Sequence, residues 1–353
     1  GLAQAMLRFD AYQLKKYDRA GDFALRDVAF LSHVKPNKNK EQALTIARLV
    51  NKERFPDNTK AAAFPVAASL HPDAFAKLKP ADTWEAGLSA GQEKKTKADK
   101  KTVWTELLEK TAADQFVKGS LGYLALIRNL RNFEEAGVDR NLVRKALRQF
   151  RGVEKVLPFR YIAAARHAPH FEGELDEALL RSMKDLPKLP GKTIFVVDVS
   201  GSMGGGIMSA KGELNRMDSA AALAAIGREM CEEPVIYATA GNDGTRIHKT
   251  GLVPARRGMA LIDAIKQMPA TLGSGGIFLT PSLRYIKEQE TEADRIIVIT
   301  DEQDCASADR DKPGLAQPFC TAGNYLLNVG AYKNGIGYGD KWVHMDGFSP
   351  QMF

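Results

Sequence analysis

Residues 194–203 read Ile194-Phe-Val-Val-Asp198-Val-Ser200-Gly-Ser202-Met203. The apolar run from Ile194 to Val197 predicts a strand covered on both faces, because such strands carry no polar alternation. Beyond it, one carboxylate and two hydroxyls follow at alternate positions, where their oxygens can converge on one hard cation, Mg²⁺ or Mn²⁺. An acidic ligand could then replace a water on that cation. The alternative is a strand-end turn in which Asp and Ser side chains accept backbone hydrogen bonds.

The surrounding pattern predicts an α/β fold. Apolar strand-like runs at 193–197, 234–240, 295–299 and 325–331 alternate with helical segments at 216–231, 257–268 and 281–290. Such alternation is typical of a mostly parallel sheet with helices on both faces, which binds ligands at the carboxyl ends of its strands. Asp301 follows the run Ile296–Thr300, so we expect Asp198 and Asp301 at the same edge of the sheet.

The first half of the chain predicts helices instead. Apolar residues recur at spacings of three and four in 2–19, 41–54, 61–70, 102–117, 121–134, 141–151 and 174–185. Short turns rich in Pro, Gly and Asp separate these segments, which favours an array of helices. Pro187-Lys-Leu-Pro190-Gly191 is the predicted linker, so we expect one domain over residues 1–190 and another over 191–353.

The two predicted domains also differ in net charge. The 353-residue chain has a formal net charge of +7, with 34 Lys and Arg against 24 Asp and Glu in residues 1–190, and 16 against 19 in residues 191–353. A basic half favours a polyanion such as nucleic acid, although a solvated helical surface rich in lysine would look the same. The sequence has no membrane-length apolar run, no visible leader and three unpatterned cysteines, which predicts a cytoplasmic protein without a membrane partner.

Several motifs resemble a known family. Leu121-Gly-Tyr-Leu-Ala-Leu-Ile-Arg128-Asn129-Leu-Arg131-Asn132, Leu157-Pro-Phe-Arg160 and Arg26-Asp27-Val28 resemble the TROVE module. The motif Asp198-Val-Ser200-Gly-Ser202, with Thr300-Asp301 ending a later strand, resembles a von Willebrand factor A domain and its metal-ion-dependent adhesion site. A TROVE module fused to such a domain defines the Ro autoantigen family of RNA-binding ribonucleoproteins.

The resemblance implies a fold of class α + α/β. A HEAT-like array of helical repeats would form a ring, closed by a Rossmann-like A domain with a mostly parallel sheet. It also implies binding of small noncoding Y RNAs on the outer surface of the ring and of misfolded RNA ends in its hole. Some bacterial members work with an exoribonuclease. Family members usually carry more helical residues before the segment that starts here, so residues 1–190 would be either a short variant of the TROVE module or a sequence that begins partway through it.

The predicted metal ligands, from the residues and the resemblance together, are Asp198, Ser200, Ser202 and Asp301. The family places a threonine directly after a Gly-Gly pair in a second loop. Here Gly275-Gly276 is followed by Ile277, and Thr280, three residues further on, is the candidate replacement. No histidine base for Ser200 is visible in the sequence, which disfavours hydrolase chemistry.

For the RNA, the resemblance places Lys16 and His33 at contact positions for Y RNA, with Arg19 next to the family's arginine position at Ala20. The alternative for His33 is a buried, hydrogen-bonded histidine. Arg128 and Arg131 lie in the TROVE-like stretch. Residues 139–151 predict a helix with an apolar face and a basic one, and arginine suits phosphate because its guanidinium donates two parallel hydrogen bonds. The basic positions of that helix are Arg144, Lys145, Arg148 and Arg151.

We therefore predict a non-catalytic, Ro-type protein that binds small noncoding RNA and holds Mg²⁺ or Mn²⁺. An exoribonuclease or another protein would bind through the A domain. The alternative is a metal-dependent scaffold for protein interactions, in which the cation captures a carboxylate of the partner and the basic half has no RNA to bind.

Overall fold

The computed structural model describes residues 4–5, 8, 25–33, 97–205, 207–209, 212–330 and 341–347. The chain divides into two compact units, residues 1–107 and 108–353. In the first unit, α3 spans Leu25–Ser32. The predicted helices at 41–54 and 61–70, and nearly all of 2–19, lie outside the described residues. Within the described part, none of the helices combines the length and the apolarity that crossing a bilayer requires.

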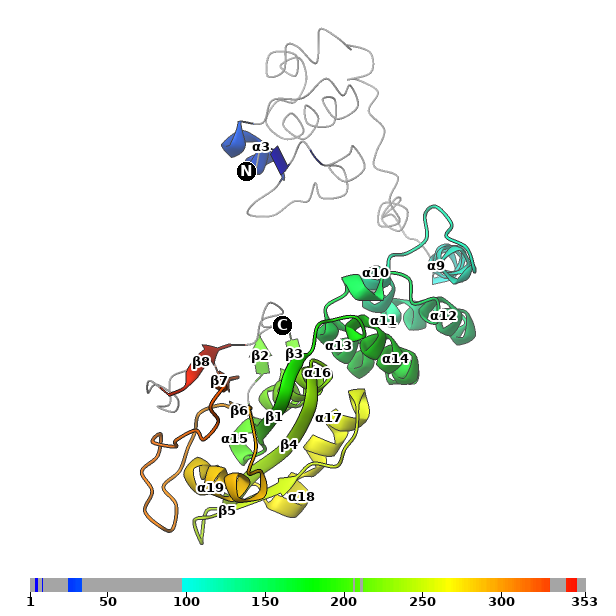
Figure 1. Ribbon diagram of the computed structural model, residues 1–353. Helices are drawn as coiled ribbons and strands as arrows, with labels where there is room; N and C mark the ends of the chain where they lie inside the picture. The colour runs from blue at the N-terminus through cyan, green and yellow to red at the C-terminus, as the bar shows by residue number, and fades with distance from the viewer. Residues whose placement is uncertain are drawn as a thin grey trace. The chain divides into compact units, whose positions relative to one another are not determined.

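A six-stranded sheet forms the centre of the second unit, in the order β5-β4-β1-β6-β7-β8 (Figure 1). All neighbouring pairs are parallel except β4 and β5. The strands are β1 (Leu189–Asp198), β4 (Cys231–Asn242), β5 (Ile247–Leu252), β6 (Arg295–Thr300), β7 (Gly323–Asn328) and β8 (Val343–Asp346). A separate antiparallel ribbon pairs β2 (Ile207–Ser209) with β3 (Gly212–Asn215). The predicted mostly parallel sheet is therefore confirmed, and the edge strands β5 and β8 are additions to it.

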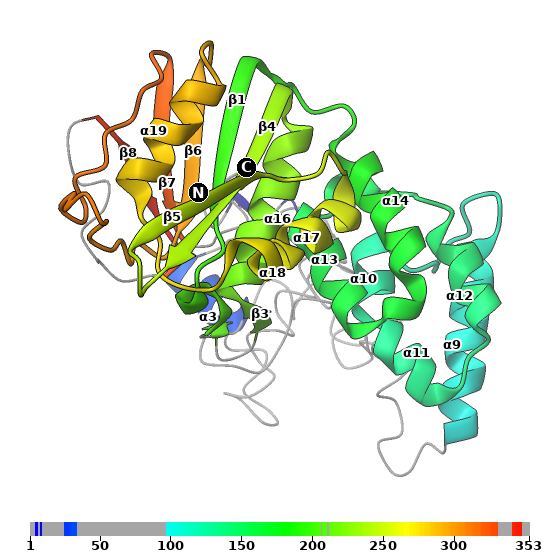
Figure 2. The same cartoon turned by 90° about the horizontal axis from the view of Figure 1, so that it is seen from below.

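Both faces of the central strands are apolar, as expected for parallel strands covered on two sides. Ile194 and Val196 of β1 pack with Leu283 and Ile286 of α19 (Leu279–Gln289). The alternate residue, Phe195, lies on the opposite face, where Gly227 of α16 (Arg216–Glu229) approaches its ring so closely that a Cβ would clash. Figure 2 shows α19 over β6 and β7.

The α/β part contains further helices besides α16 and α19. The short helix α15 (Gly201–Gly204) lies just after Asp198, and α17 (Gly258–Gln267) and α18 (Pro269–Leu272) follow β5. The predicted helices at 216–231, 257–268 and 281–290 correspond to α16, α17 and α19 within two residues at each end. Asn215 begins α16 with a capping box, in which its side chain accepts from the Asp218 N–H at 2.8 Å.

A layer of helices precedes the sheet in the chain. It comprises α9 (Lys97–Ala112), α10 (Tyr123–Arg128), α11 (Leu130–Ala136), α12 (Arg140–Leu147), α13 (Pro158–His167) and α14 (Glu172–Met183), with short 3-10 turns at Val153–Lys155 and Pro169–Phe171. The predicted change from helices to sheet at residue 191 lies inside the second unit, where β1 begins at Leu189.

Two predicted helices are shorter than their patterns suggested. The predicted helix 121–134 is broken at Asn129, whose side chain donates to the Ala125 carbonyl at 2.7 Å. The predicted helix 139–151 ends at Leu147, because Phe150 and Gly152 both adopt positive φ. Apolar periodicity did not register either break, since both arise from local backbone geometry. The turn at Gly137 and the cap at Asp139 are as expected, with Asp139 accepting from the Asn141 N–H at 2.9 Å.

The helical layer contacts the α/β part through polar side chains. Arg166 of α13 forms an ion pair with Asp218 of α16, which is buried. Asp176 of α14 accepts a hydrogen bond from the Met259 N–H, in the first turn of α17, at 2.7 Å. Asp176 therefore satisfies one of the N–H groups that a helix N-terminus leaves unpaired.

Candidate cation site and basic surface

Asp198 and Asp301 lie at the same edge of the sheet. Asp198 is the last residue of β1, and Asp301 directly follows β6, the parallel neighbour of β1 (Figure 1). Both carboxylates are fully buried. The tight turn of α15 then brings Ser200 and Ser202 to the same place. The parallel pairing of β1 and β6 therefore places two carboxylates and two hydroxyls close together, as predicted.

Three oxygens are arranged as neighbouring ligands of one ion would be. The Oγ atoms of Ser200 and Ser202 are 3.1 Å apart, and Ser202 Oγ donates to Asp301 Oδ1 at 3.2 Å. Octahedral Mg²⁺ with metal–oxygen bonds of about 2.1 Å places adjacent ligands about 3.0 Å apart. The side chains present therefore fit a small hard cation.

Asp198 is held by hydrogen bonds from two directions. Its Oδ1 accepts from the Ser200 N–H at 2.8 Å, and its Oδ2 accepts from Thr300 Oγ1 at 2.6 Å. Burial raises the pKa of Asp198 to about 6, and the charge of Asp301 adds to the rise, while the hydrogen bonds from Ser200 and Thr300 oppose it. The strand-end turn of the alternative interpretation is thus also present, and it orients the carboxylate whether or not a cation binds.

Arg216 is a member of this cluster that the sequence did not indicate. Its Nη1 donates to Asp301 Oδ2 at 2.9 Å and lies 3.4 Å from the Ser202 carbonyl oxygen. The side chain is only 17% exposed. Arg216 is the first residue of α16, far from Asp301 in sequence, so no local pattern could have linked the two.

The second loop, which contains Gly275 and Gly276, lies beside the turn that carries Ser200 and Ser202. Gly201 packs against the Ser274 carbonyl, which would lie 2.7 Å from a Cβ at Gly201. Ile277 is fully buried in the core beside α19, which explains an apolar residue at this position. Thr280 lines a surface pocket with Arg284, Asp311 and Lys312. Thr280 as a metal ligand stays a prediction.

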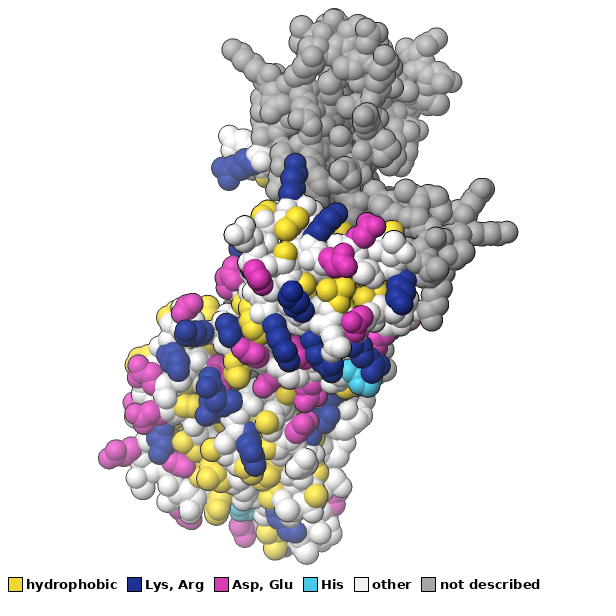
Figure 3. Space-filling view, turned by 90° about the vertical axis from the view of Figure 1, so that its right-hand side faces the viewer, with side chains coloured by type: hydrophobic (Ala, Val, Ile, Leu, Met, Phe, Trp, Pro, Cys, Tyr) yellow, Lys and Arg dark blue, Asp and Glu magenta, His cyan; other side chains and the backbone are white. Residues whose placement is uncertain are grey.

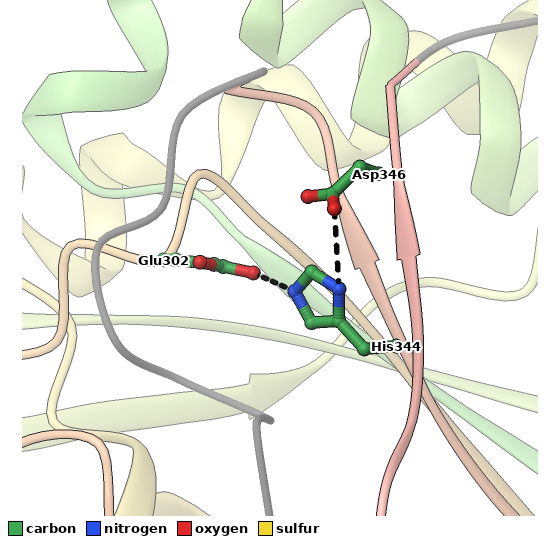
Figure 4. Close-up of side chains that lie close together, drawn as sticks. All are labelled: Glu302, His344 and Asp346. Carbon is green, nitrogen blue, oxygen red and sulfur yellow. Dashed lines mark hydrogen bonds and ion pairs between the residues drawn. The ribbon is translucent and has the colours of Figure 1, made fainter.

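A second polar cluster starts at the residue after Asp301 (Figure 4). His344 of β8 contacts Glu302 through Nε2, and its Nδ1 lies 3.5 Å from Asp346 Oδ2. These three side chains lie close enough together to suggest a metal. The two ring nitrogens face different carboxylates, so the imidazole also bridges Glu302 and Asp346. This contact holds the buried Glu302 and, through the backbone, the loop that carries Asp301.

The predicted RNA-contacting residues take several different positions in the helical layer. Arg144 and Arg148 both reach Glu174 of α14, at 3.7 and 2.8 Å. Arg144 also donates to the His170 carbonyl at 3.1 Å. Glu174 is largely buried, whereas Arg148 is 63% exposed. Two guanidinium groups thus share one carboxylate and leave an excess of positive charge at the surface.

Arg151 corrects the prediction of a continuous basic face. It lies beyond the end of α12, and its guanidinium donates to the Thr111 and Ala113 carbonyls, where α9 ends. An arginine there satisfies carbonyls that a helix C-terminus leaves unpaired and is favoured by the helix dipole. Arg151 therefore has a structural role that its spacing in the sequence did not reveal.

Other predicted contact residues lie at the surface. Arg128 and Lys145 are exposed, and Arg131 is exposed in an ion pair with Glu135 at 3.5 Å. His33 is exposed at the end of α3, so the alternative of a buried histidine is wrong. Lys16 and Arg19 lie outside the described residues. On the face that Figure 3 shows, Lys and Arg side chains of the described residues are interspersed with carboxylates.

Comparison with known proteins identifies the family. The model of the TROVE domain matches residues 52–264, more than half of the 353-residue chain. This chain belongs to the TROVE domain family. The crystal structure of the Deinococcus radiodurans RO (RSR) protein is similar in fold, with a TM-score of 0.58 and 15% sequence identity over 99% of this chain and 73% of that one. No curated protein matches the sequence.

The TROVE match extends through the helical layer into the sheet. It includes α9 to α14, β1 and α16, and it ends within α17. Two aromatic residues in or next to the Leu157-Pro-Phe-Arg160 motif lie in the core of the helical layer. Phe159 is buried, and Tyr161 is fully buried, with its hydroxyl donating to the Val153 carbonyl at 2.7 Å. These two residues therefore pack the helices against one another.

Proposed function

We propose that this TROVE protein is a Ro-type RNA-binding protein that holds small noncoding RNA through an exposed basic surface. The observation that carries the proposal is the TROVE match, together with the shared position of Arg144 and Arg148 on Glu174. A guanidinium has five N–H donors, so contact with one carboxylate leaves donors for phosphate. Glu174 holds the two side chains in place, which lowers the entropic cost of binding.

RNA contact in this proposal is mainly to phosphates and shape, as expected for structured RNA. Beside the partly exposed Arg144, the residues assigned to it are exposed: Lys145 on α12, Arg148 directly after α12, Arg128 on α10 and Arg131 on α11. In the first unit, Lys16, Arg19 and His33 are assigned through the family resemblance alone. HEAT-like packing of the helices and a cytoplasmic location belong to the same proposal.

The α/β part, in this proposal, is a von Willebrand factor A domain whose adhesion site holds Mg²⁺ or Mn²⁺. Ser200, Ser202 and Asp301 would supply ligands, and Asp198 would contribute directly or through water. When bound, the cation would offer an open position to an acidic group of a protein, such as an exoribonuclease, or of an RNA end. The proposal contains no catalytic step, and end-labelled RNA incubated with the protein and Mg²⁺ is expected to stay intact.

The basic surface is tested by neutral substitution. Arg144→Gln with Arg148→Gln is expected to weaken binding of a structured small RNA by about tenfold or more, because two phosphate contacts are lost. The matched control is Arg284→Gln on α19, which removes an arginine that is 59% exposed and ion-paired to Asp311. Filter binding measures both, and circular dichroism checks the fold. Equal affinities for the double variant and the control would refute the assignment of this surface.

The alternative function, a metal-dependent scaffold for proteins, is favoured by the same oxygen cluster at Ser200, Ser202 and Asp301. The two functions predict different behaviour in a pull-down treated with ribonuclease. Partners held through RNA are released, whereas partners held through a carboxylate on the cation stay bound and are released by a chelator.

A further inference from the structure

The cation site already contains a positive charge that belongs to the protein. Arg216 Nη1 donates to Asp301 Oδ2 at 2.9 Å, and both side chains are largely shielded from water. Arg216 cannot lose its proton in a protein, so this charge is permanent. The negative charge of the buried Asp301 is therefore compensated without a metal.

The two oxygens of Asp301 have different partners. Oδ1 accepts from Ser202 Oγ and faces the pair of hydroxyls, whereas Oδ2 takes the guanidinium. A cation held by Ser200, Ser202 and Oδ1 would thus share one carboxylate with Arg216. Like charges on opposite oxygens of one carboxylate repel strongly where little water screens them.

The backbone of Arg216 is held in place. The preceding residue, Asn215, caps α16, and Asp218 completes the reciprocal hydrogen bond to the Asn215 N–H at 3.2 Å. Release of Asp301 therefore requires a rotation of the Arg216 side chain, since the backbone cannot easily move away.

We propose that Arg216 is a resident counter-cation that competes with Mg²⁺ or Mn²⁺ for Asp301. While the guanidinium occupies Oδ2, the site binds divalent cations weakly, and removal of this charge converts it into a tight site. The inference rests on the cation site of the proposed function and does not depend on RNA binding.

Titration with Mn²⁺, with free ion measured by electron paramagnetic resonance, tests the competition. Arg216→Gln is expected to bind Mn²⁺ at least about tenfold more tightly than the unmodified protein. Arg216→Lys retains the charge and is expected to stay within about threefold of it. The matched control is Arg228→Gln on the same helix, where the arginine pairs with Glu229 instead; its affinity should be unchanged. Unchanged or weaker binding by Arg216→Gln, or no Mn²⁺ binding by any form, would overturn the proposal.

Thermal unfolding tests the same competition in case Arg216→Gln is too unstable for the Mn²⁺ titration. Without metal, Arg216→Gln leaves Asp301 buried without this ion pair and is expected to have a lower Tm. Added MnCl₂ should raise the Tm of this variant more than that of the unmodified protein, because at one ligand concentration the tighter complex stabilises the folded state more. An equal or smaller rise contradicts the competition. RNA affinity measured in the presence of a chelator tests the proposed RNA binding separately. A negative result for metal competition therefore does not refute RNA binding, and a negative result for RNA binding does not refute metal competition.

Discussion

At the residue scale, the buried carboxylates of the α/β part differ in what compensates their charge. Asp198 takes hydrogen bonds from a backbone N–H and a hydroxyl, Asp301 takes a guanidinium, and Glu302 takes an imidazole. Glu229 is held by Arg257 and Arg228, both with a nitrogen 3.0 Å from Oε1. Because an uncompensated buried charge is costly, each of these pairs matters for folding as well as for any ligand.

Glu229 gives a pH-dependent prediction. Burial by itself would raise its pKa, but the hydrogen bond and charge of Arg257, followed by Arg228, outweigh this effect and lower the pKa. A lowered folded-state pKa stabilises the protein above the unfolded value of about 4.3. That stabilisation is lost as the pH falls through the folded pKa. Arg257→Gln is therefore expected to reduce the free energy of unfolding by about 1–2 kcal/mol at pH 7.

Urea unfolding at pH 7 and at about pH 3 measures this effect. The difference between Arg257→Gln and the unmodified protein should shrink at the lower pH, which lies below the unfolded-state pKa of Glu229, because part of the stabilisation is then lost. The neighbouring Arg256, which is exposed, supplies the control substitution Arg256→Gln. A difference that stays constant between the two pH values would show that the ion pair is not its source.

At the element scale, helix ends decide where the layers meet. Arg151 satisfies carbonyls at the end of α9, and Asp176 satisfies an N–H at the start of α17. The second contact requires Gly258, which has a φ of 55° and no room for a Cβ beside the Asp176 carboxylate. The junction between α14 and α17 thus depends on a glycine for both its backbone conformation and its space.

Substitution of Gly258 tests the junction. Gly258→Ala is expected to lower the free energy of unfolding by about 1–3 kcal/mol, because it combines positive φ with a steric clash. The matched control, Gly173→Ala in α14, adds a Cβ that meets nothing within 4 Å. It should stabilise by about 0.4–1 kcal/mol, because it only reduces the freedom of the unfolded chain. Chemical denaturation measures both, and effects of the same sign would contradict this account.

At the scale of the whole molecule, charge is distributed unevenly along the chain. The excess of Lys and Arg over Asp and Glu belongs entirely to residues 1–190. A basic half attracts a polyanion and releases counterions when it binds, which makes affinity depend on salt. Local ion pairs such as those on Glu174 reduce this charge without removing it.

Salt dependence is the corresponding prediction. RNA affinity should fall steeply between 50 and 200 mM KCl, by about 10³-fold if roughly six phosphates are contacted. The plot of log affinity against log salt should lose a slope of about 2 in Arg144→Gln with Arg148→Gln. Fluorescence anisotropy at several KCl concentrations gives both slopes. Affinity independent of salt would exclude phosphate contact as the main source of binding.

The parallel strands, the helices between them and the position of Asp198 and Asp301 at one edge could all be predicted from the sequence. These features follow from local patterns: apolar runs, helical periodicity and the rule that parallel strands end together. The family was also readable from motifs. Periodicity failed at Asn129 and Phe150, where single residues break a helix without disturbing the apolar pattern.

The pairing of charged side chains, in contrast, became visible only in the folded molecule. Arg216 on Asp301, Arg148 on Glu174, His344 on Glu302 and Arg151 at the end of α9 join residues from separate elements. Such pairs depend on how helices and strands pack, on helix ends and on rotamers, none of which leaves a periodic trace in the sequence. Ile277 is a further example, because it stands where the resemblance expects a threonine ligand. It is buried in the core with residues of α19 and the sheet, and this packing could not be predicted from the residues next to it in the sequence.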